Sequence, residues 1–162
     1  MSKIKHYYPN DADTILRAFK LAQDAHDGQF RASGRPYITH PCVVCDILID
    51  LGLDVPTLCA ALLHDTVEDT YVTDRQLRDE FGDEIANLVA GVTKLDKLQF
   101  ASKEEEQAEN IRKMFFAMAK DIRVIIIKLA DRLHNMRSLQ YLSRERQLAM
   151  AKETIDIFAP LA

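Results

Sequence analysis

Four ionisable side chains follow closely on the apolar run at positions 58–63: His64, Asp65, Glu68 and Asp69. Residues four apart lie one turn apart on the same face of a helix. A helix through this stretch therefore aligns Glu68 with His64, and the two aspartates with each other. Acidic groups at a helix C-terminus oppose the helix dipole, and burying them without partners is costly. We therefore expect these side chains to be held by contacts with one another, with an arginine or with a metal ion. An exposed acidic helix end is the weaker interpretation.

Two further residues complete a set of metal-ligating type. Asp131 follows the apolar run 124–127 in the middle of a helical stretch, and His40 stands at a helix N-terminus. Together with His64 and Asp65 they offer two nitrogen and two oxygen ligands and no thiolate. That mixture suits a six-coordinate ion such as Mn²⁺ better than a structural zinc. Each histidine taken singly is more often a core residue, so the predicted metal site depends on the combination.

The predicted ion indicates a phosphohydrolase. A bound divalent ion lowers the pKa of a water molecule and polarises a phosphoryl oxygen. Glu68 and Asp69, one turn from the His64-Asp65 pair, could orient that water or accept its proton. This hypothesis predicts that replacing Asp65 with alanine removes both metal retention and activity.

A phosphate substrate needs positive charge near the site. Arg31 lies beside Ser33-Gly34 in the loop before His40. Other cationic residues lie in the same loop, on the helix of Asp131 or on the stretch before that helix: Arg35, Lys128, Arg132, Arg137, Arg112 and Lys113. Arginine suits phosphate because it binds two oxygens at once. Solvated surface charge explains most of these residues, whereas Arg31 is predicted to be functional because its loop leads to a candidate ligand.

The elements that must position these residues are all helices, and no segment shows the alternation of a β-strand. Expected helices cover residues 13–27, 39–51, 54–69, 73–81, 83–97, 105–120, 121–139 and 143–158, with loops at 28–39 and 98–104. Thr39, Asp54 and Ser143 are of the residue types that cap helix N-termini. The sequence thus predicts an all-α helical bundle with its chemistry at the helix ends and on one central helix.

Length and composition exclude several classes of protein. The chain has 162 residues, 48% of them apolar, and a net charge of −4. This length predicts one domain, and the acidic balance offers no reason to bind nucleic acid directly. No apolar run is long enough to span a membrane, and the N-terminus lacks a signal-peptide pattern. The three cysteines, an odd number, indicate core packing rather than disulfides. We therefore expect a cytoplasmic domain; no pattern specifies its oligomeric state.

Three motifs together resemble a known family. They are Arg-Ala-Ser-Gly-Arg-Pro-Tyr-Ile-Thr-His-Pro at 31–41, Ala-Ala-Leu-Leu-His-Asp-Thr-Val-Glu-Asp-Thr at 60–70 and Lys-Leu-Ala-Asp-Arg-Leu-His-Asn-Met-Arg at 128–137. In this order they are similar to the N-terminal hydrolase domain of the RelA/SpoT homologues, which synthesise and degrade the alarmones ppGpp and pppGpp. The stretches 91–95 and 107–114 also resemble that family. The resemblance covers roughly residues 10 to 162.

The resemblance implies an HD-domain fold, an all-helical bundle around one Mn²⁺ ion. By motif, the implied metal ligands are His40, His64, Asp65 and Asp131, and the implied catalytic acids are Glu68 and Asp69. The implied substrate contacts are Arg31, Ser33 and Asn135, together with Lys128 and Ser138. Ala32 departs from the family, where a basic residue is common, which predicts a weaker contact to phosphate or base here.

The implied reaction is Mn²⁺-dependent hydrolysis of the 3′-pyrophosphate of ppGpp or pppGpp to GDP or GTP and pyrophosphate. The chain ends at 160–162 without a helix-stop signal. Residues 1–162 are therefore expected to be one hydrolase domain of a bifunctional enzyme, truncated before its natural end and without synthetase and regulatory domains. Three alternatives remain open: a stand-alone alarmone or NADPH phosphohydrolase, a non-catalytic nucleotide-binding module, and an HD phosphodiesterase for cyclic or deoxynucleotides.

Overall fold

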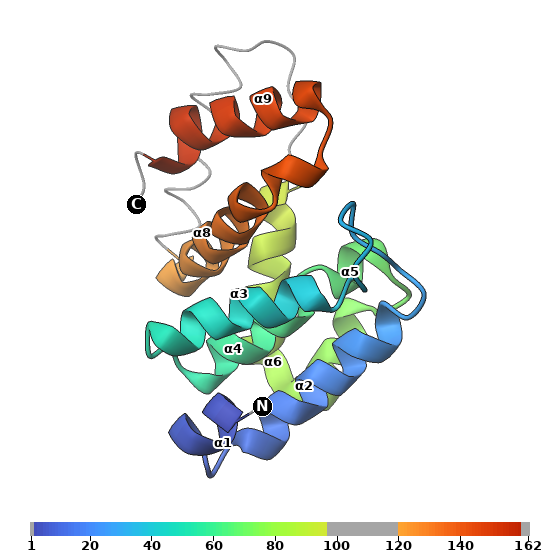
Figure 1. Cartoon of the computed structure of the whole chain (residues 1–162). Helices are drawn as coiled ribbons and strands as arrows, with labels where there is room; N and C mark the ends of the chain where they lie inside the picture. Colours follow the sequence, from blue (N-terminus) through green and yellow to red (C-terminus); the bar gives the residue numbers. More distant parts are fainter. Residues whose placement is uncertain (1, 97–119, 160–162) are drawn as a thin grey trace.

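The computed structural model describes residues 2–96 and 120–159 (Figure 1). Its α-helices are α1 (Ser2–Tyr7), α2 (Ala12–Ala25), α3 (Thr39–Asp50), α4 (Val55–Leu63), α5 (Thr66–Asp69), α6 (Asp74–Asp96), α8 (Ile122–Arg137) and α9 (Arg144–Glu153). A 3₁₀ turn covers Leu139–Tyr141, and a π-helical turn covers Thr154–Phe158. Across the described ranges the only β-type pairing is the isolated bridge between Phe30 and Pro36. The all-α prediction is confirmed, whereas the expectations for 98–104, 105–120 and 107–114, and those for Arg112 and Lys113, fall outside the described residues.

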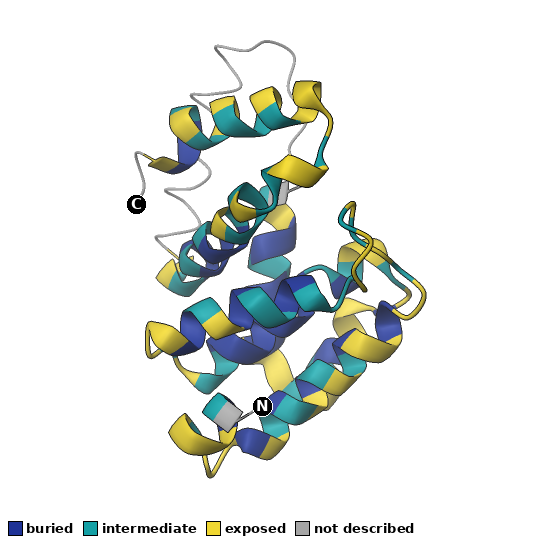
Figure 2. Cartoon of the chain, in the orientation of Figure 1, coloured by how far each residue is buried: buried dark blue, intermediate teal, exposed yellow. Residues whose placement is uncertain are grey.

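Helix α4 lies at the centre of the bundle. It packs against α2, α3, α6 and α8, and every residue from Thr57 to Leu63 is buried. Figure 2 shows this buried centre and the more exposed outer faces of α2 and α9. Burial of the apolar side chains at 58–63 stabilises the fold, because each Å² of apolar surface removed from water contributes about 25 cal/mol to the free energy of folding. The helix that ends at the candidate site is therefore the most firmly enclosed element of the described fold.

Side-chain caps explain where α4, α8 and α9 begin. The side chain of Asp54 accepts a hydrogen bond from the backbone N–H of Thr57, and Ser143 and Asp121 cap α9 and α8 in the same way. The prediction that Thr39 caps α3 is wrong, because Ile38 occupies the cap position and the Thr39 hydroxyl donates to the carbonyl of Pro36.

One expected helix is interrupted. The expected helix 54–69 is broken after Leu63, so that His64 and Asp65 form the junction between α4 and the short α5. The last helix ends at Phe158 as expected, but its final turn from Thr154 is π-helical. Helix α6 keeps the expected break between two helical segments, because Gly82 adopts φ 84° and ψ 170° there. The junction after α4 matters most, because it frees two candidate ligands from the regular helix surface. None of the described helices combines the length and apolar character needed to cross a bilayer.

Candidate metal centre and adjoining pocket

The four predicted ligands come from three elements and meet in one place. His40 stands in the first turn of α3, His64 and Asp65 form the α4–α5 junction, and Asp131 lies within α8. The Nε2 atom of His40 is 3.1 Å from Oδ1 of Asp131 and 3.6 Å from Oδ2 of Asp65. The Nε2 atom of His64 is 3.1 Å from Oδ1 of Asp65. The packing of α3, α4 and α8 thus brings together residues that lie as much as 91 positions apart in the sequence.

The donor atoms of this cluster fit a metal ion. Ligand atoms of His40, His64 and Asp65 all lie within 4.8 Å of one another. In His64, Nδ1 is 2.8 Å from the carbonyl oxygen of Ala61, which leaves Nε2 buried without a hydrogen bond. A metal-ligating histidine typically has this arrangement, with one ring nitrogen held by a backbone carbonyl and the other free to bind the ion. A buried Nε2 atom that makes no hydrogen bond and lies 3.1 Å from the Asp65 carboxylate supports a bound cation among these groups.

The charges of the cluster also call for a cation. Burial raises the pKa of Asp65, but the His64 ring beside it outweighs that effect and holds the pKa well below its usual range. Burial likewise opposes ionisation of Asp131, but hydrogen bonding to His40 and the Lys128 ammonium keep its pKa well below its usual range. Burial lowers the pKa of His64, and the Asp65 carboxylate raises it to about 9. The Lys128 ammonium and the protonated His64 ring balance the two carboxylates here; when His64 gives up its proton to act as a ligand, a bound metal ion would supply that positive charge instead.

Asp131 is held by two side chains of its own helix. Lys128 donates from Nζ to Oδ2 at 3.0 Å, and Asn135 donates from Nδ2 to Oδ1 at 2.7 Å. The Oδ1 atom of Asn135 in turn accepts from Nη2 of Arg31 at 2.6 Å. Lys128 is only 8% exposed, so the structure places it within the cluster beside Asp131. Arg31 and Asn135 therefore connect the buried cluster to the loop that carries the predicted substrate contacts.

The sequence interpretation did not assign a role to Tyr37 or His134, which also contact the cluster. The Tyr37 hydroxyl lies 2.7 Å from Oδ2 of Asp65. The Nδ1 atoms of His40 and His134 are 2.6 Å apart, and the two rings stack with centroids 4.9 Å apart. Burial and the His40 ring lower the pKa of His134 to about 4, so its ring is neutral and its Nδ1 atom can accept a hydrogen bond from the Nδ1–H group of His40. Tyr37 precedes His40 by three residues and His134 follows Asp131 by three, a helical spacing that could have drawn attention to both.

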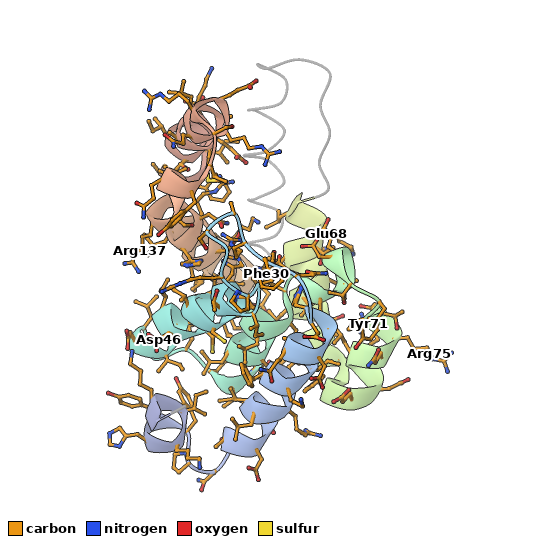
Figure 3. The ribbon with its side chains drawn as sticks, turned by 45° about the vertical axis from the view of Figure 1, so that its right-hand side comes forward. Phe30, Asp46, Glu68, Tyr71, Arg75 and Arg137 are labelled. Atoms are coloured by element: carbon orange, nitrogen blue, oxygen red, sulfur yellow. The ribbon has the colours of Figure 1, made fainter. Side chains whose placement is uncertain are left out.

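The predicted acid pair lies at the outer edge of the cluster. Glu68 and Asp69 are both exposed on α5, and Figure 3 shows Glu68 on the outer surface of the molecule. The Oδ2 atom of Asp69 is 3.3 Å from the Tyr37 hydroxyl, and the backbone N–H of Asp69 donates to the carbonyl of Asp65 at 2.9 Å. Asp69 is therefore tied to the same hydrogen-bond network as the candidate ligand Asp65.

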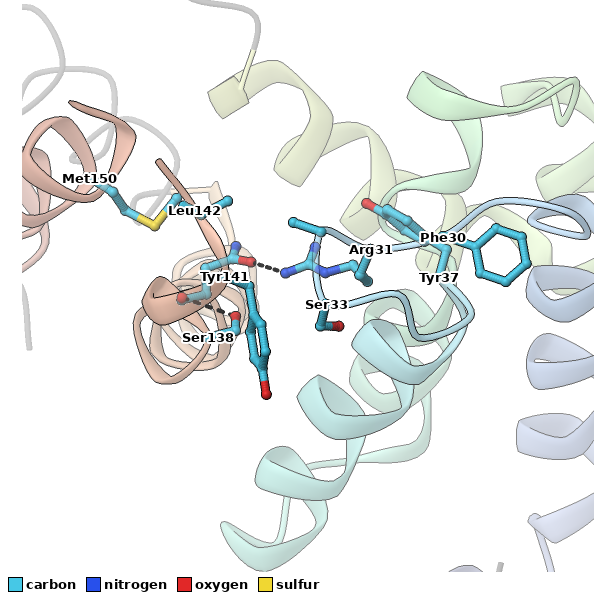
Figure 4. A pocket seen from close by; sticks show the side chains of 10 residues that line it. Phe30, Arg31, Ser33, Tyr37, Ser138, Tyr141, Leu142 and Met150 are labelled. Atoms are coloured by element: carbon cyan, nitrogen blue, oxygen red, sulfur yellow. Dashed lines mark hydrogen bonds between the residues drawn. The ribbon is translucent and has the colours of Figure 1, made fainter. Parts of the chain in front are cut away.

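An open pocket of about 280 Å³ adjoins the cluster. Its lining residues come from the 28–38 loop, the end of α8 and the segment up to α9: Phe30, Arg31, Ala32, Ser33, Tyr37, Asn135, Ser138, Tyr141, Leu142 and Met150. Figure 4 shows Arg31 reaching across the pocket to the α8 side. Four of the five predicted substrate contacts line this pocket, and the fifth, Lys128, lies in the buried cluster. Arg31, Tyr37 and Asn135 line the pocket and also reach the network around the metal site.

The fold and this arrangement of residues agree with the comparisons to known proteins. A family model described as the HD domain matches residues 18–162. The chain belongs to the HD domain family. Since that match includes all four candidate ligands and most of the described helices, it confirms the HD-domain bundle implied by the resemblance.

Several relatives of this HD domain act on guanosine nucleotides by name. The chain is 54% identical over 160 residues to the bifunctional (p)ppGpp synthase/hydrolase SpoT of Escherichia coli K12, covering 98% of this chain and 23% of the relative. It is 56% identical over 142 residues to the guanosine-3′,5′-bis(diphosphate) 3′-pyrophosphohydrolase of Haemophilus influenzae, covering 88% and 21%. The chain thus spans about a fifth of the length of these curated relatives, and its resemblance to the RelA/SpoT homologues is confirmed.

A solved structure is similar to this chain over most of the length of both proteins. It is described as a metazoan ortholog of SpoT that hydrolyses ppGpp. It matches this HD domain with a TM-score of 0.69 and 32% sequence identity, covering 88% of this chain and 83% of that chain. The likeness therefore extends over most of both folds.

Proposed function

We propose that this HD domain hydrolyses the 3′-pyrophosphate of ppGpp and pppGpp, releasing pyrophosphate and GDP or GTP, in a reaction that depends on one Mn²⁺ ion. The observation that carries the proposal is the buried Nε2 atom of His64, which makes no hydrogen bond and lies beside the Asp65 carboxylate, with a second histidine and Asp131 nearby and a pocket lined by Arg31 adjoining them. The relatives named as ppGpp hydrolases point to the same reaction.

The proposed ligands of the ion are His40, His64, Asp65 and Asp131. Two imidazole nitrogens and two carboxylate oxygens without a thiolate favour Mn²⁺ over structural zinc, because hard oxygen ligands and open positions suit a six-coordinate ion. When bound, such an ion lowers the pKa of water and polarises a phosphoryl oxygen. The histidines are each 1% exposed, so the protein excludes bulk water from their side of the site.

The proposed substrate contacts lie around the pocket. The Arg31 guanidinium, already hydrogen bonded to Asn135, would present its remaining N–H groups to phosphate oxygens. Ser33 and Ser138 offer hydroxyl groups from opposite walls of the pocket. A contact from Lys128 stays a prediction, and in the structure its ammonium neutralises Asp131.

Glu68 and Asp69 are the proposed proton acceptors. The attacking water forms a bond to the phosphorus that carries the ribose 3′-oxygen, and one of its protons passes to a carboxylate of this pair. The bond between that phosphorus and the ribose oxygen breaks, the 3′-oxygen takes up a proton, and pyrophosphate leaves. Both acids are exposed at the edge of the cluster, which leaves them able to exchange the proton with solvent.

Two predictions about the whole protein accompany this proposal. The first is that the HD domain belongs to a longer bifunctional enzyme, which is supported by its span of only 23% of the E. coli SpoT sequence. The second is a cytoplasmic location, which fits a nucleotide substrate.

The test measures pyrophosphate release from ppGpp by this 162-residue chain, with Mn²⁺ and after chelation, beside the Asp65→Ala variant. Release that requires both Mn²⁺ and Asp65 supports the proposal. Binding of ppGpp and Mn²⁺ without release would favour a nucleotide-binding module, and turnover of NADPH in place of ppGpp would favour the stand-alone phosphohydrolase. Release that persists in the Asp65→Ala variant would contradict the assigned metal site.

A further inference from the structure

Tyr37 lies in the 28–38 loop, three residues before His40, and its hydroxyl reaches two acidic side chains. The Oη atom is 2.7 Å from Oδ2 of Asp65 and 3.3 Å from Oδ2 of Asp69. Asp65 is a proposed metal ligand and Asp69 a proposed proton acceptor. We propose that Tyr37 is a positioning residue, whose hydroxyl orients the Asp65 carboxylate toward the metal. This inference rests on the proposed function of the site.

The Tyr37 hydroxyl can act only as a donor toward these groups. An ionised carboxylate only accepts hydrogen bonds, and a phenol, whose ordinary pKa is about 10, keeps its proton at neutral pH. A single proton supports one strong hydrogen bond, and the shorter distance assigns it to Asp65. Asp69, at the longer distance, therefore retains acceptor capacity for a proton from water.

This hydrogen bond distinguishes the two oxygen atoms of Asp65. Oδ2 accepts from Tyr37, whereas Oδ1 lies 3.1 Å from Nε2 of His64. The terminal torsion of an aspartate is broad, so a carboxylate without outer contacts can rotate away from its metal. With Oδ2 bound to the hydroxyl, Oδ1 stays directed at the histidine nitrogen. Hydrogen bonds of this kind to ligating groups typically contribute about 10- to 100-fold in metal affinity or activity.

The ring of Tyr37 is itself held on several sides. It stacks on His26, with ring centroids 4.5 Å apart and an interplanar angle of 26°. His26 is buried, and its Nδ1 atom lies 2.8 Å from Oε1 of Gln29. The Nε2 atom of Gln29 in turn donates to the backbone carbonyl of Asp69 at 3.0 Å. The Arg31 guanidinium lies 5.7 Å from the centroid of the Tyr37 ring (Figure 4). These contacts restrict the ring, so the position of its hydroxyl is set by the fold.

Tyr8 provides a matched control for the loss of one hydroxyl. Its Oη atom donates to the carbonyl of Leu53 at 2.6 Å, and its ring is also partly buried. Leu53 follows the C-terminal end of α3, whereas His40 stands in its first turn. Twelve residues of helix separate these ends, or about 18 Å. Tyr8→Phe therefore removes a comparable hydrogen bond without touching the metal site.

The experiment compares Tyr37→Phe, Tyr8→Phe and the unmodified chain by calorimetric titration with Mn²⁺ and by ppGpp hydrolysis at saturating Mn²⁺. Tyr37→Phe is expected to weaken Mn²⁺ binding by about 10- to 100-fold and to lower kcat about 10-fold. A positioning role predicts a KM for ppGpp within about twofold of the unmodified value, whereas a direct substrate contact from this pocket-lining residue would raise KM and overturn the role. Tyr8→Phe should leave all three values unchanged, although its melting temperature falls by a similar amount.

The outcomes separate this inference from the function on which it rests. If the unmodified chain binds Mn²⁺ and hydrolyses ppGpp while Tyr37→Phe matches it in Mn²⁺ affinity and kcat, the positioning role is wrong and the proposed function stands. An equal loss in Tyr37→Phe and Tyr8→Phe would also overturn the role, since it would reflect stability alone. If the unmodified chain neither binds Mn²⁺ nor releases pyrophosphate, the proposed function fails and the inference fails with it.

Discussion

The metal cluster and the pocket beside it are built in opposite ways. In the cluster, His40 and His64 are each 1% exposed, and the two carboxylates are held by hydrogen bonds from Tyr37, Lys128 and Asn135. In the pocket, aromatic side chains remain open to solvent: Phe30 is 66% exposed and Tyr141 is 52% exposed. The cluster is thus fixed before any ligand arrives, whereas the pocket walls can adjust.

This difference follows from what each region has to bind. A small ion needs ligand atoms held at short, defined distances, and buried carboxylates are stable only when their charge is matched. A nucleotide is larger and carries several charges, so solvent-exposed groups that adapt to it are sufficient. We therefore expect substitutions in the cluster to change metal affinity and kcat, and substitutions in the pocket to change KM.

The largest effect should come from Asp65→Asn, which keeps the size of the side chain but removes its charge. The ion contributes several kcal/mol of transition-state stabilisation, and each 1.36 kcal/mol corresponds to a tenfold rate change, so kcat should fall about 1000-fold or more. Stopped assays of pyrophosphate release, paired with measurement of bound Mn²⁺, check this. Activity within tenfold of the unmodified chain would show that Asp65 is not a ligand.

A smaller effect is expected from His134→Leu, which removes the hydrogen-bond partner of His40 Nδ1. Without that acceptor the His40 ring is less firmly oriented, and Mn²⁺ affinity should fall about 10- to 100-fold. Excess Mn²⁺ should restore most of kcat, because the ligand itself is still present. Calorimetric titration measures the affinity, and failure of high Mn²⁺ to rescue activity would point to a direct role of His134 in the reaction.

Arg31→Lys should change binding of the substrate rather than of the metal. Lysine keeps the charge but cannot donate to Asn135 and also form a bidentate pair with a phosphate group. The KM for ppGpp should therefore rise about tenfold. Mn²⁺ affinity and kcat should stay within about twofold of the unmodified values. A loss of Mn²⁺ binding in this variant would remove the distinction between the cluster and the pocket.

The smallest change is expected from Ser33→Ala at the pocket wall. A neutral hydrogen bond contributes about 0.5–1.5 kcal/mol, so the loss of this hydroxyl should raise KM about threefold. Steady-state kinetics with ppGpp as the substrate measures the change. A fall in kcat larger than the rise in KM would place Ser33 with the catalytic groups instead.

Local sequence patterns were sufficient for most of the described helices, though not for α1 or the break after Leu63, and for the residue types of the site. Asp54 caps α4 as predicted, and the apolar residues that follow it form the buried centre of the bundle. His40, the His64-Asp65 pair and Asp131 could be selected because ligand-type side chains next to apolar runs are costly to bury without partners. These features depend on neighbours in the sequence, and such short-range preferences can be recognised without the fold.

Long-range contacts could not be predicted in this way. The bond from Arg31 to Asn135 joins residues 104 positions apart, and the contact between His40 and His134 spans 94 positions. Neither follows from helix propensity, because each depends on how α3 and the 28–38 loop pack against α8. The interruption after Leu63 was missed for the same reason: the side chain of Asp65 is held by His40 and Tyr37, which lie on other elements.

Neighbouring residues thus explain that the chain is helical, where most helices begin and which residues could bind a divalent ion. Helix packing explains which of their atoms face one another, why the Lys128–Asp131 pair of one helix is buried, and how Tyr37 and His134 come to support the ligands. Helix formation is governed by neighbouring residues, whereas the geometry of a metal site is governed by the packing of helices that are distant in the sequence.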